Sequence, residues 1–401
     1  MRPPRICFGW HPAHDCGGDR GGFPGLSALP RPPDGTLRAL RRSYSVAGNR
    51  GYLVIGEAAG RLFACDAVQS GFLDLRRAAD AVETDDLVRR IDAAFDLLVL
   101  PMAYEIRTGV DYSRLVQVLA AIRVPIVTLG LGIACEPQTP LAALPPSVAE
   151  LLSVLDHRAA LFGVRADVTR DWLHRHGFSR AVALGCPSLH LYPQKIMRLE
   201  PPTAPPDRLS CLTGGYLLRD AGRGRALSQF FAGACATYVL QDEPFVDGVF
   251  GEDAVVFDDA RHEIDAALFN EAVERVHGYR PPFRRYRYFD SLDTWRCCAA
   301  AHHIFVGDRF HGGVVALQTG APAVLFLKDV RAQELAAFYD IPRLDLHDAV
   351  TAGYAATVDR CLSKAAIAQL KSTFVERHEA FRRSLAACDL ELAGEADAFS
   401  P

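Results

Sequence analysis

Short, almost wholly apolar runs alternate with amphipathic stretches along the chain from residue 51 onward. The first five runs are residues 52–55, 97–100, 125–129, 160–164 and 182–184. Runs that are apolar at every position are typical of parallel strands buried on both faces. They therefore predict five strands of a buried parallel sheet.

The stretches between these runs have the spacing of helices. Residues 86–95 and 112–122 are amphipathic, and residues 168–176 stop at Gly177, a natural C-terminal cap. Alternation of strands and helices predicts a doubly wound sheet.

A Pro-rich stretch, residues 193–208, then predicts an exposed linker. Apolar runs resume beyond it, at residues 209–212, 237–240, 304–306 and 323–327, and a long helix is expected over 364–387. The pattern predicts an α/β fold with two Rossmann-like lobes, residues 1–200 and 208–362, followed by a C-terminal helix and tail over 363–401. The active site of such a protein is expected in the cleft between the lobes.

Composition narrows the functional classes. The 401 residues include 49% hydrophobic residues and carry a net charge of −4, which argues against a general nucleic-acid binder. The basic and aromatic residues 284–288 are interpreted as a solvated edge or a rim that contacts an anionic acceptor. No apolar run reaches the ~20 residues of a membrane span, and no hydrophobic signal core follows the basic start. We expect a cytoplasmic protein, and a homo-oligomer is compatible with the sequence.

Cysteine and histidine usage predicts neither disulfides nor a metal site. The eleven cysteines are odd in number and contain no C-x-x-C pair, so most are expected to be small buried hydrophobes. His11, His14 and Cys16 lie within six residues, but no second ligand pair stands at a suitable spacing.

The segment 302–322 contains the most informative chemistry. A strand ends at Val306, and a helix begins near His311 and ends at Gly320. Arg309 and His311 therefore emerge where open α/β sheets bind ligands and where helix N–H groups attract anions. Gly312 and Gly313 are expected to let a ligand approach the backbone. A purely structural interpretation of Asp308, Arg309 and His311, as a cap, a salt bridge and a core-edge histidine, remains open.

Arg165 occupies the equivalent position in the first lobe, at the end of a buried strand. Two arginines, one from each lobe, are suited to clamp a phosphate and a carboxylate, because the planar guanidinium binds both bidentately. The alternative is that Arg165 only pairs with Asp167.

These segments resemble the polysaccharide pyruvyltransferase family. The resemblance rests on Gly-Asp-Arg-Phe-His-Gly-Gly at 307–313 with Gly320 and Pro322, and on Gly-Val-Arg at 163–165. It also rests on Gly-Asn-Arg-Gly at 48–51, Gly-Leu-Gly at 130–132, Gly-Cys-Pro-Ser at 185–188 and residues 328–335. The sequence departs from the family pattern in one respect. The family's opening loop usually lies near the N-terminus, whereas here 47 residues precede the matching segment 48–51. Residues 15–22 are the alternative match to that loop.

The resemblance implies a GT-B-like fold and phosphoenolpyruvate as co-substrate, with no cofactor or metal. It places the catalytic histidine at His311 and the donor-binding arginines at Arg165 and Arg309. Further donor-binding candidates are Arg331, Lys328, Gly312 and Gly313. Asp308 is expected to orient His311, whose role as general acid calls for a pKa near neutrality. Acceptor-side candidates are Asn49, Glu105 and Ser188, and the expected acceptor is a sugar or lipid-linked saccharide.

Two other functions remain open at this stage. A glycosyltransferase using a nucleotide-sugar donor would share the fold and would need a carboxylate for the donor ribose, for which Glu334 is the candidate. A catalytically inactive sugar or anion binder is the second alternative.

Overall fold

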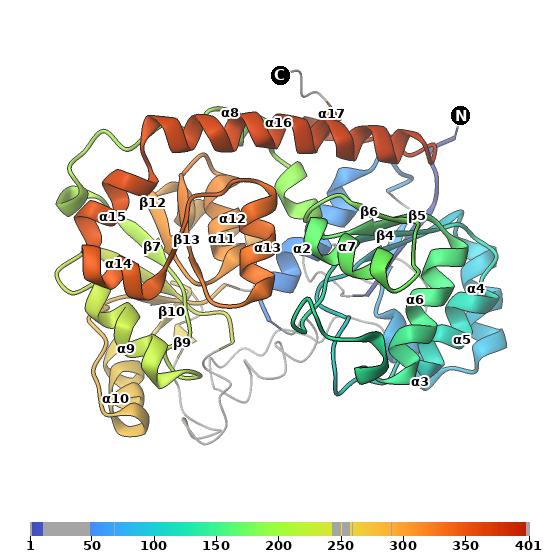
Figure 1. The fold of residues 1–401 in the computed structure, drawn as a ribbon, viewed down its shortest axis with the longest axis horizontal. Coiled ribbons are helices and arrows are strands. Elements are labelled where there is room, and N and C mark those ends of the chain that lie inside the picture. The colour runs from blue at the N-terminus through green and yellow to red at the C-terminus, as the bar shows by residue number, and fades with distance from the viewer. Residues whose placement is uncertain are drawn as a thin grey trace.

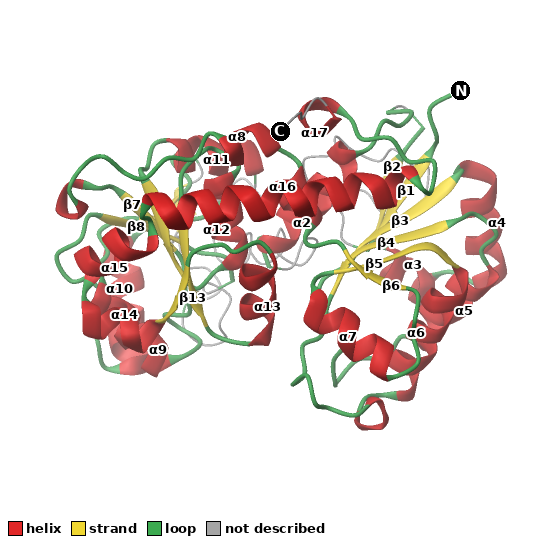
Figure 2. Cartoon of the chain, turned by 45° about the horizontal axis from the view of Figure 1, so that its top comes forward, coloured by secondary structure: helices red, strands yellow, loops and turns green. Residues whose placement is uncertain are grey.

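The computed structural model describes residues 2–10, 49–67, 69–242, 250, 257–258, 260–289 and 291–397. Two α/β lobes lie side by side, each with a central sheet that has helices on both faces (Figures 1 and 2). The predicted fold class, α/β with two Rossmann-like lobes, is confirmed.

The first lobe contains a six-stranded, wholly parallel sheet in the order β2-β1-β3-β4-β5-β6. Its strands are β1 (Ile6–Gly9), β2 (Gly71–Leu73), β3 (Leu97–Pro101), β4 (Ile126–Leu131), β5 (Ala159–Val164) and β6 (Ala181–Ala183). Its covering helices are α3 (Leu75–Ala81), α4 (Thr84–Ala94), α5 (Ser113–Ala121), α6 (Pro146–Arg158) and α7 (Asp167–Arg175). Every position of β3 and β4 is buried, as the apolar runs predict.

The second lobe contains an eight-stranded sheet in the order β14-β13-β12-β7-β8-β11-β10-β9. Its strands are β7 (Cys211–Thr213), β8 (Ala236–Val239), β9 (Phe257–Asp258), β10 (Glu263–Ile264), β11 (Tyr286–Arg287), β12 (Ile304–Gly307), β13 (Ala323–Leu327) and β14 (Arg343–Asp345). Only the pairings of β10 are antiparallel among the described strands of this sheet. Its helices are α9 (Ala221–Phe230), α10 (Ala266–His277), α11 (Leu292–Ala300), α12 (Phe310–Leu317), α13 (Val330–Phe338), α14 (Leu346–Ala352) and α15 (Tyr354–Cys361).

The long C-terminal helix α16 (Lys364–Ala386) runs along both lobes (Figure 1). Ile367, Leu370 and Phe374 pack into the core of the second lobe, whereas Phe381 and Leu385 pack against the first. The expected helix over 364–387 is confirmed. A short α17 (Gly394–Asp397) follows it. Among the described residues, no helix is both long and apolar enough to cross a membrane.

Residues 52–55, predicted as a strand, instead belong to the helix α2 (Gly51–Leu62). Leu53, Val54 and Ile55 are all buried, because α2 lies between the lobes and packs on both. A helix buried on all sides has no polar face, so its sequence reads like a buried strand. The true first strand, β1, lies among the first fifty residues, for which the pattern predicted no element.

The stretch 193–208 is less exposed than its prolines suggest. It begins with α8 (Pro193–Met197), and Ile196 and Leu199 are buried in the core. The two expected glycine helix stops are confirmed, because Gly177 and Gly320 adopt positive φ values of 90° and 89°.

Candidate active site

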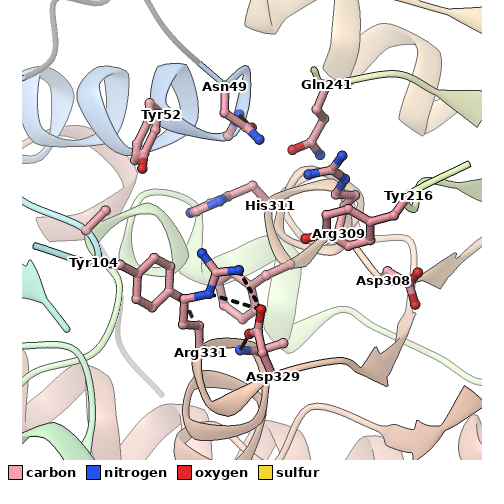
Figure 3. Close-up of a pocket in the computed structure, with 14 residues that line it drawn as sticks. Asn49, Tyr52, Tyr104, Tyr216, Gln241, Asp308, Arg309, His311, Asp329 and Arg331 are labelled. Atoms are coloured by element: carbon pink, nitrogen blue, oxygen red, sulfur yellow. Dashed lines mark hydrogen bonds and ion pairs between the residues drawn. The ribbon is translucent and has the colours of Figure 1, made fainter. Parts of the chain in front are cut away.

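A cavity of about 110 Å³ lies between the lobes at the carboxyl ends of strands from both sheets (Figure 3). On the first-lobe side it is lined by the start of α2 and by the segment after β3; on the second-lobe side, by segments after β7, β8, β12 and β13. Its lining residues are Asn49, Gly51, Tyr52, Ala103, Tyr104, Tyr216, Gln241, Asp308, Arg309, Phe310, His311, Asp329, Arg331 and Ala332.

The topology of the second sheet explains this position. Neighbouring strands β7 and β12 are a switch point, since the chain continues from β7 to β8 on one side while β12 lies on the other. Loops diverge at such a point and leave a crevice at the carboxyl end of the sheet.

Three helices begin at the cavity, namely α2, α12 and α13. The first N–H groups of a helix have no partner within it and carry the positive end of its dipole. Only part of this capacity is used internally: the Asn49 side chain accepts from the Gly51 N–H at 2.8 Å, and Asp329 accepts from the Ala332 N–H at 3.1 Å. The cavity therefore favours an anion.

His311, in the first turn of α12, projects between the lobes (Figure 3). Its Nε2 lies 3.7 Å from Sγ of Cys186 in the first lobe. Burial, together with the positive charge of Arg165, lowers the pKa of His311 to about 3. This value lies below the near-neutral pKa that the sequence predicts for a general acid, because burial and the nearby guanidinium both disfavour the imidazolium.

Arg309, just before α12, is buried at the second-lobe side of the cavity. Its Nε donates to the carbonyl of Gly215 at 2.8 Å, its Nη2 pairs with Asp242, and its Cζ lies 3.9 Å from the ring centroid of Tyr216. These contacts fix the guanidinium plane at the cavity wall.

Arg331, in the first turn of α13, is the second guanidinium on the cavity wall. Its Nε and Nη2 bond the Asp329 carboxylate, at 3.0 and 2.5 Å. Its Cζ lies 5.0 Å from the ring centroid of Tyr104, whose hydroxyl donates to the Arg331 carbonyl at 3.1 Å. Tyr104 thus connects the two lobes at the edge of the cavity.

Arg165 is fully buried next to the cavity but does not line it. Its Cζ lies 3.9 Å from the Tyr104 ring centroid and its Nε donates to the Gly130 carbonyl at 3.0 Å. Nη1 and Nη2 have no hydrogen-bond partner among the described residues. Asp167, the alternative partner for Arg165, instead pairs with Arg170 and Arg377. The buried carboxylate of Glu334 acts on this charge but makes no hydrogen bond to either nitrogen, so the guanidinium keeps two donors for an anion.

The comparisons with known proteins decide the family. A family model described as polysaccharide pyruvyl transferase matches residues 60–327, more than half of the chain. The chain belongs to the polysaccharide pyruvyl transferase family. The matched region contains Arg165, Arg309 and His311, whereas the start of α2 and Arg331 lie outside it.

Other comparisons give more distant similarities. A search of curated proteins found no match. Among solved structures, a UDP-N-acetylglucosamine 2-epimerase is 9% identical, with 97% of each chain covered and a TM-score of 0.46. The epimerase from Neisseria meningitidis is 8% identical over 83% of this chain and 88% of its own, with a TM-score of 0.42. Trehalose 6-phosphate synthase from Burkholderia multivorans is 12% identical over 96% and 94%, with a TM-score of 0.43.

Two expectations about this pyruvyl transferase family member are corrected in the segment after β12. Asp308 does not orient His311: its carboxylate pairs with Arg223 at 2.8 Å and is turned away from the imidazole (Figure 3). Gly312 and Gly313, predicted to let a ligand approach the backbone, do not line the cavity. A Cβ on Gly312 would lie 2.7 Å from the ring of Phe305, and one on Gly313 3.0 Å from Leu325, so these glycines let α12 pack on the sheet.

Lys328 and Glu334 lie beside the cavity without lining it. The Lys328 Nζ stacks on Tyr216, 3.2 Å from the ring centroid. Glu334 is buried, its Oε2 accepts from Oγ1 of Thr169 at 2.8 Å, and burial raises its pKa to about 7. Oε1 of Glu334 has no hydrogen-bond partner among the described residues.

Only one of the three acceptor-side candidates, Asn49, lines the cavity. Ser188 is fully buried and its Oγ lies 3.0 Å from Sγ of Cys186. Glu105 is buried and accepts from Nε1 of Trp10 and from the Tyr112 hydroxyl, at 2.9 and 2.6 Å. Ser188 and Glu105 are therefore part of the interior.

The cavity residues that the sequence did not indicate include Tyr52, Tyr104, Tyr216 and Gln241. The last three lie two or three residues after the ends of β3, β7 and β8, so inspecting the short segments after every strand would have found them. Tyr52 was hidden by the wrong strand prediction. His11, His14, Cys16 and the alternative loop 15–22 lie outside the described residues. Within the described ranges, no three His, Cys, Asp or Glu side chains gather in a possible metal site.

Proposed function

We propose that the protein transfers a pyruvyl group from phosphoenolpyruvate to two hydroxyls of a sugar or lipid-linked saccharide and forms a ketal. The observation that carries this proposal is that one imidazole, His311, shares a small cavity with the guanidinium groups of Arg309 and Arg331 in a member of the pyruvyl transferase family.

The electrostatics of the cavity suit a small, highly charged donor. Helix starts on three sides and two guanidinium groups in the wall complement a phosphate and a carboxylate in one molecule. Arg331 uses Nε and Nη2 for Asp329 and has Nη1 available for the donor. The buried positive charge of Arg165, on the far side of the Tyr104 ring, further attracts an anionic donor into the cavity.

His311 is the proposed general acid. Its pKa of about 3 makes the imidazole neutral at pH 7, and the negative charge of a bound donor raises this pKa, so donor binding is accompanied by uptake of a proton. The imidazolium then gives a proton to the methylene carbon, and C2 becomes an oxocarbenium-like centre. A sugar hydroxyl attacks C2 and its proton returns to His311. Phosphate leaves with the proton of the second hydroxyl, which closes the ketal.

The amide groups of Asn49 and Gln241 and the phenol of Tyr52 are proposed to face the acceptor. They line the part of the cavity next to His311 (Figure 3), and neutral donors and acceptors of this kind suit sugar hydroxyls. The nucleotide-sugar alternative needed a ribose-binding carboxylate at Glu334. That side chain bonds Thr169 outside the cavity, which leaves this alternative without its anchor.

Calorimetric titration with phosphoenolpyruvate and, separately, with a UDP-sugar tests the proposal. We expect binding of phosphoenolpyruvate alone, and Arg331→Ala should weaken it at least ~10-fold, since a charge-assisted hydrogen bond contributes about 1.5–3 kcal/mol. Arg343→Ala is the matched control: its side chain is 33% exposed against 39% for Arg331 and also pairs with an aspartate, but lies outside the cavity. Tight binding of the UDP-sugar without phosphoenolpyruvate binding would reject the proposal.

A further inference from the structure

The turn that follows β6 reaches from the first lobe to α12 of the second lobe. It contains Cys186 and the 3-10 turn Pro187–His190. Cys186 contacts His311 at the start of α12, and the Ser188 carbonyl accepts from Nε2 of Gln318 at the end of the same helix, at 2.7 Å. The turn therefore holds α12 at both ends.

Cys186 lies at the centre of a short polar chain within an apolar interior. Its Sγ is 3.7 Å from Nε2 of His311 and 3.0 Å from Oγ of Ser188, and both Cys186 and Ser188 are fully buried. The positive charge of Arg165 acts on the same sulfur. A thiol sulfur accepts a hydrogen bond from an imidazole N–H, and Oγ of Ser188 is within reach of the thiol hydrogen.

The other imidazole nitrogen faces the ligand side. Nδ1 of His311 points to the start of α2: it lies 2.7 Å from the position that a Cβ on Gly51 would take, and Oδ1 of Asn49 lies 3.2 Å from that same position. Gly51 and Asn49 line the cavity, whereas Cys186 does not. The two ring nitrogens of His311 thus have different surroundings.

We propose that Cys186 is a positioning residue that binds the Nε2–H of His311 and makes Nδ1 the nitrogen that exchanges protons with the ligands. The consequence for catalysis rests on the proposed function. Nε2 keeps its proton throughout. Nδ1 gives its proton to the methylene carbon, whose π electrons form the new C–H bond, and its lone pair then receives the proton of the attacking hydroxyl.

The test is to determine which ring nitrogen of His311 carries the proton in the full-length, ligand-free protein. Isotope-labelled histidine and NMR at pH 8, where the imidazole is neutral, distinguish a protonated from an unprotonated nitrogen, and His311→Gln identifies the signal. We expect the Nε2–H form in the wild type and in Cys186→Ser, and a mixture of both forms in Cys186→Ala. Cys7→Ala, which also removes a fully buried thiol, should leave the wild-type form.

The wild-type spectrum is decisive even if a variant fails to fold: a proton on Nδ1 overturns the proposal. An unchanged spectrum in folded Cys186→Ala overturns it as well. In the transfer assay, Cys186→Ala should lower kcat by ~10-fold and shift its pH profile without changing KM for phosphoenolpyruvate, and Cys186→Ser should restore both. Because the NMR measurement needs no reaction, lack of turnover together with the Nε2–H form rejects the proposed function and supports the positioning role.

Discussion

Gly51 and His311, 260 positions apart in the chain, meet so closely that a Cβ on Gly51 would lie 2.7 Å from Nδ1 of the imidazole. The start of α2 and the start of α12 therefore enclose the imidazole between them. α2 belongs to the N-terminal part of the chain but packs on the second lobe, so it connects the position of His311 to the arrangement of the lobes.

Gly51→Ala should displace the imidazole, because a Cβ contact of 2.7 Å is too short for the ring to stay in place. A misplacement of about 1 Å is enough to lower kcat by ~100-fold. Steady-state kinetics of pyruvyl transfer measures the effect, with Gly222→Ala as control, since a Cβ there would meet only Oδ1 of Asp220 at 3.7 Å. Wild-type kcat in Gly51→Ala would show that the imidazole position is not critical.

His311→Gln should lower kcat by roughly 10²- to 10⁴-fold, the usual contribution of general acid–base catalysis, while phosphoenolpyruvate still binds. Because burial and Arg165 hold the pKa of His311 at about 3, binding of the anionic donor at pH 7 should take up a proton in the wild type. Calorimetry in buffers of different ionisation enthalpy measures this uptake. If the uptake persists in His311→Gln, another group is the one that titrates.

Gly312→Ala should destabilise the fold by about 1–3 kcal/mol, since the new Cβ would lie 2.7 Å from the ring of Phe305. Urea denaturation measures the loss. The affinity of the folded variant for phosphoenolpyruvate should change little, because the glycine serves packing. Full stability combined with lost binding would restore the original interpretation that Gly312 lies against the ligand.

The ion pair between Glu57 of α2 and Arg296 of α11 anchors α2 to the second lobe. Both side chains are largely buried, at 3% and 11% exposure. Glu57→Met should therefore cost about 3 kcal/mol, because it leaves the buried Arg296 charge with only the exposed Asp293 as ion-pair partner, and Glu57→Met with Arg296→Met should recover much of this. A double-mutant cycle on unfolding free energies measures the coupling; additive effects would mean that the pair does not hold α2.

His378 of α16 gives the fold a pH dependence because it is buried, with its Nδ1 3.1 Å from Nδ1 of His190. Burial lowers the pKa of His378 from 6.5 to about 4. The unfolded chain therefore binds more protons than the folded one between these values. The contribution of neutral His378 to the free energy of unfolding is complete above pH 6.5. It is lost as the pH falls toward 4, by up to about 3 kcal/mol. Urea midpoints across this range should vary less in His378→Gln than in the wild type or in the exposed control His347→Gln.

Much of the fold could be predicted from local pattern. Strands buried on both faces, such as β3, β4 and β13, were visible as apolar runs. Gly177 and Gly320, which have positive φ values, follow the ends of helices as expected. The same pattern failed at α2, because a helix that is buried on all sides lacks the polar face by which its period is recognised.

The sequence by itself determined where Arg309 and His311 stand, since a buried strand followed directly by a helix delivers the residues between them to the carboxyl end of the sheet. Only the tertiary structure decided what these residues meet. The contacts of His311 with Gly51 and Cys186, the placement of Arg165 behind Tyr104, and the packing role of Gly312 join segments far apart in the chain. No local pattern encodes them, because they depend on how the two lobes and α2 pack together.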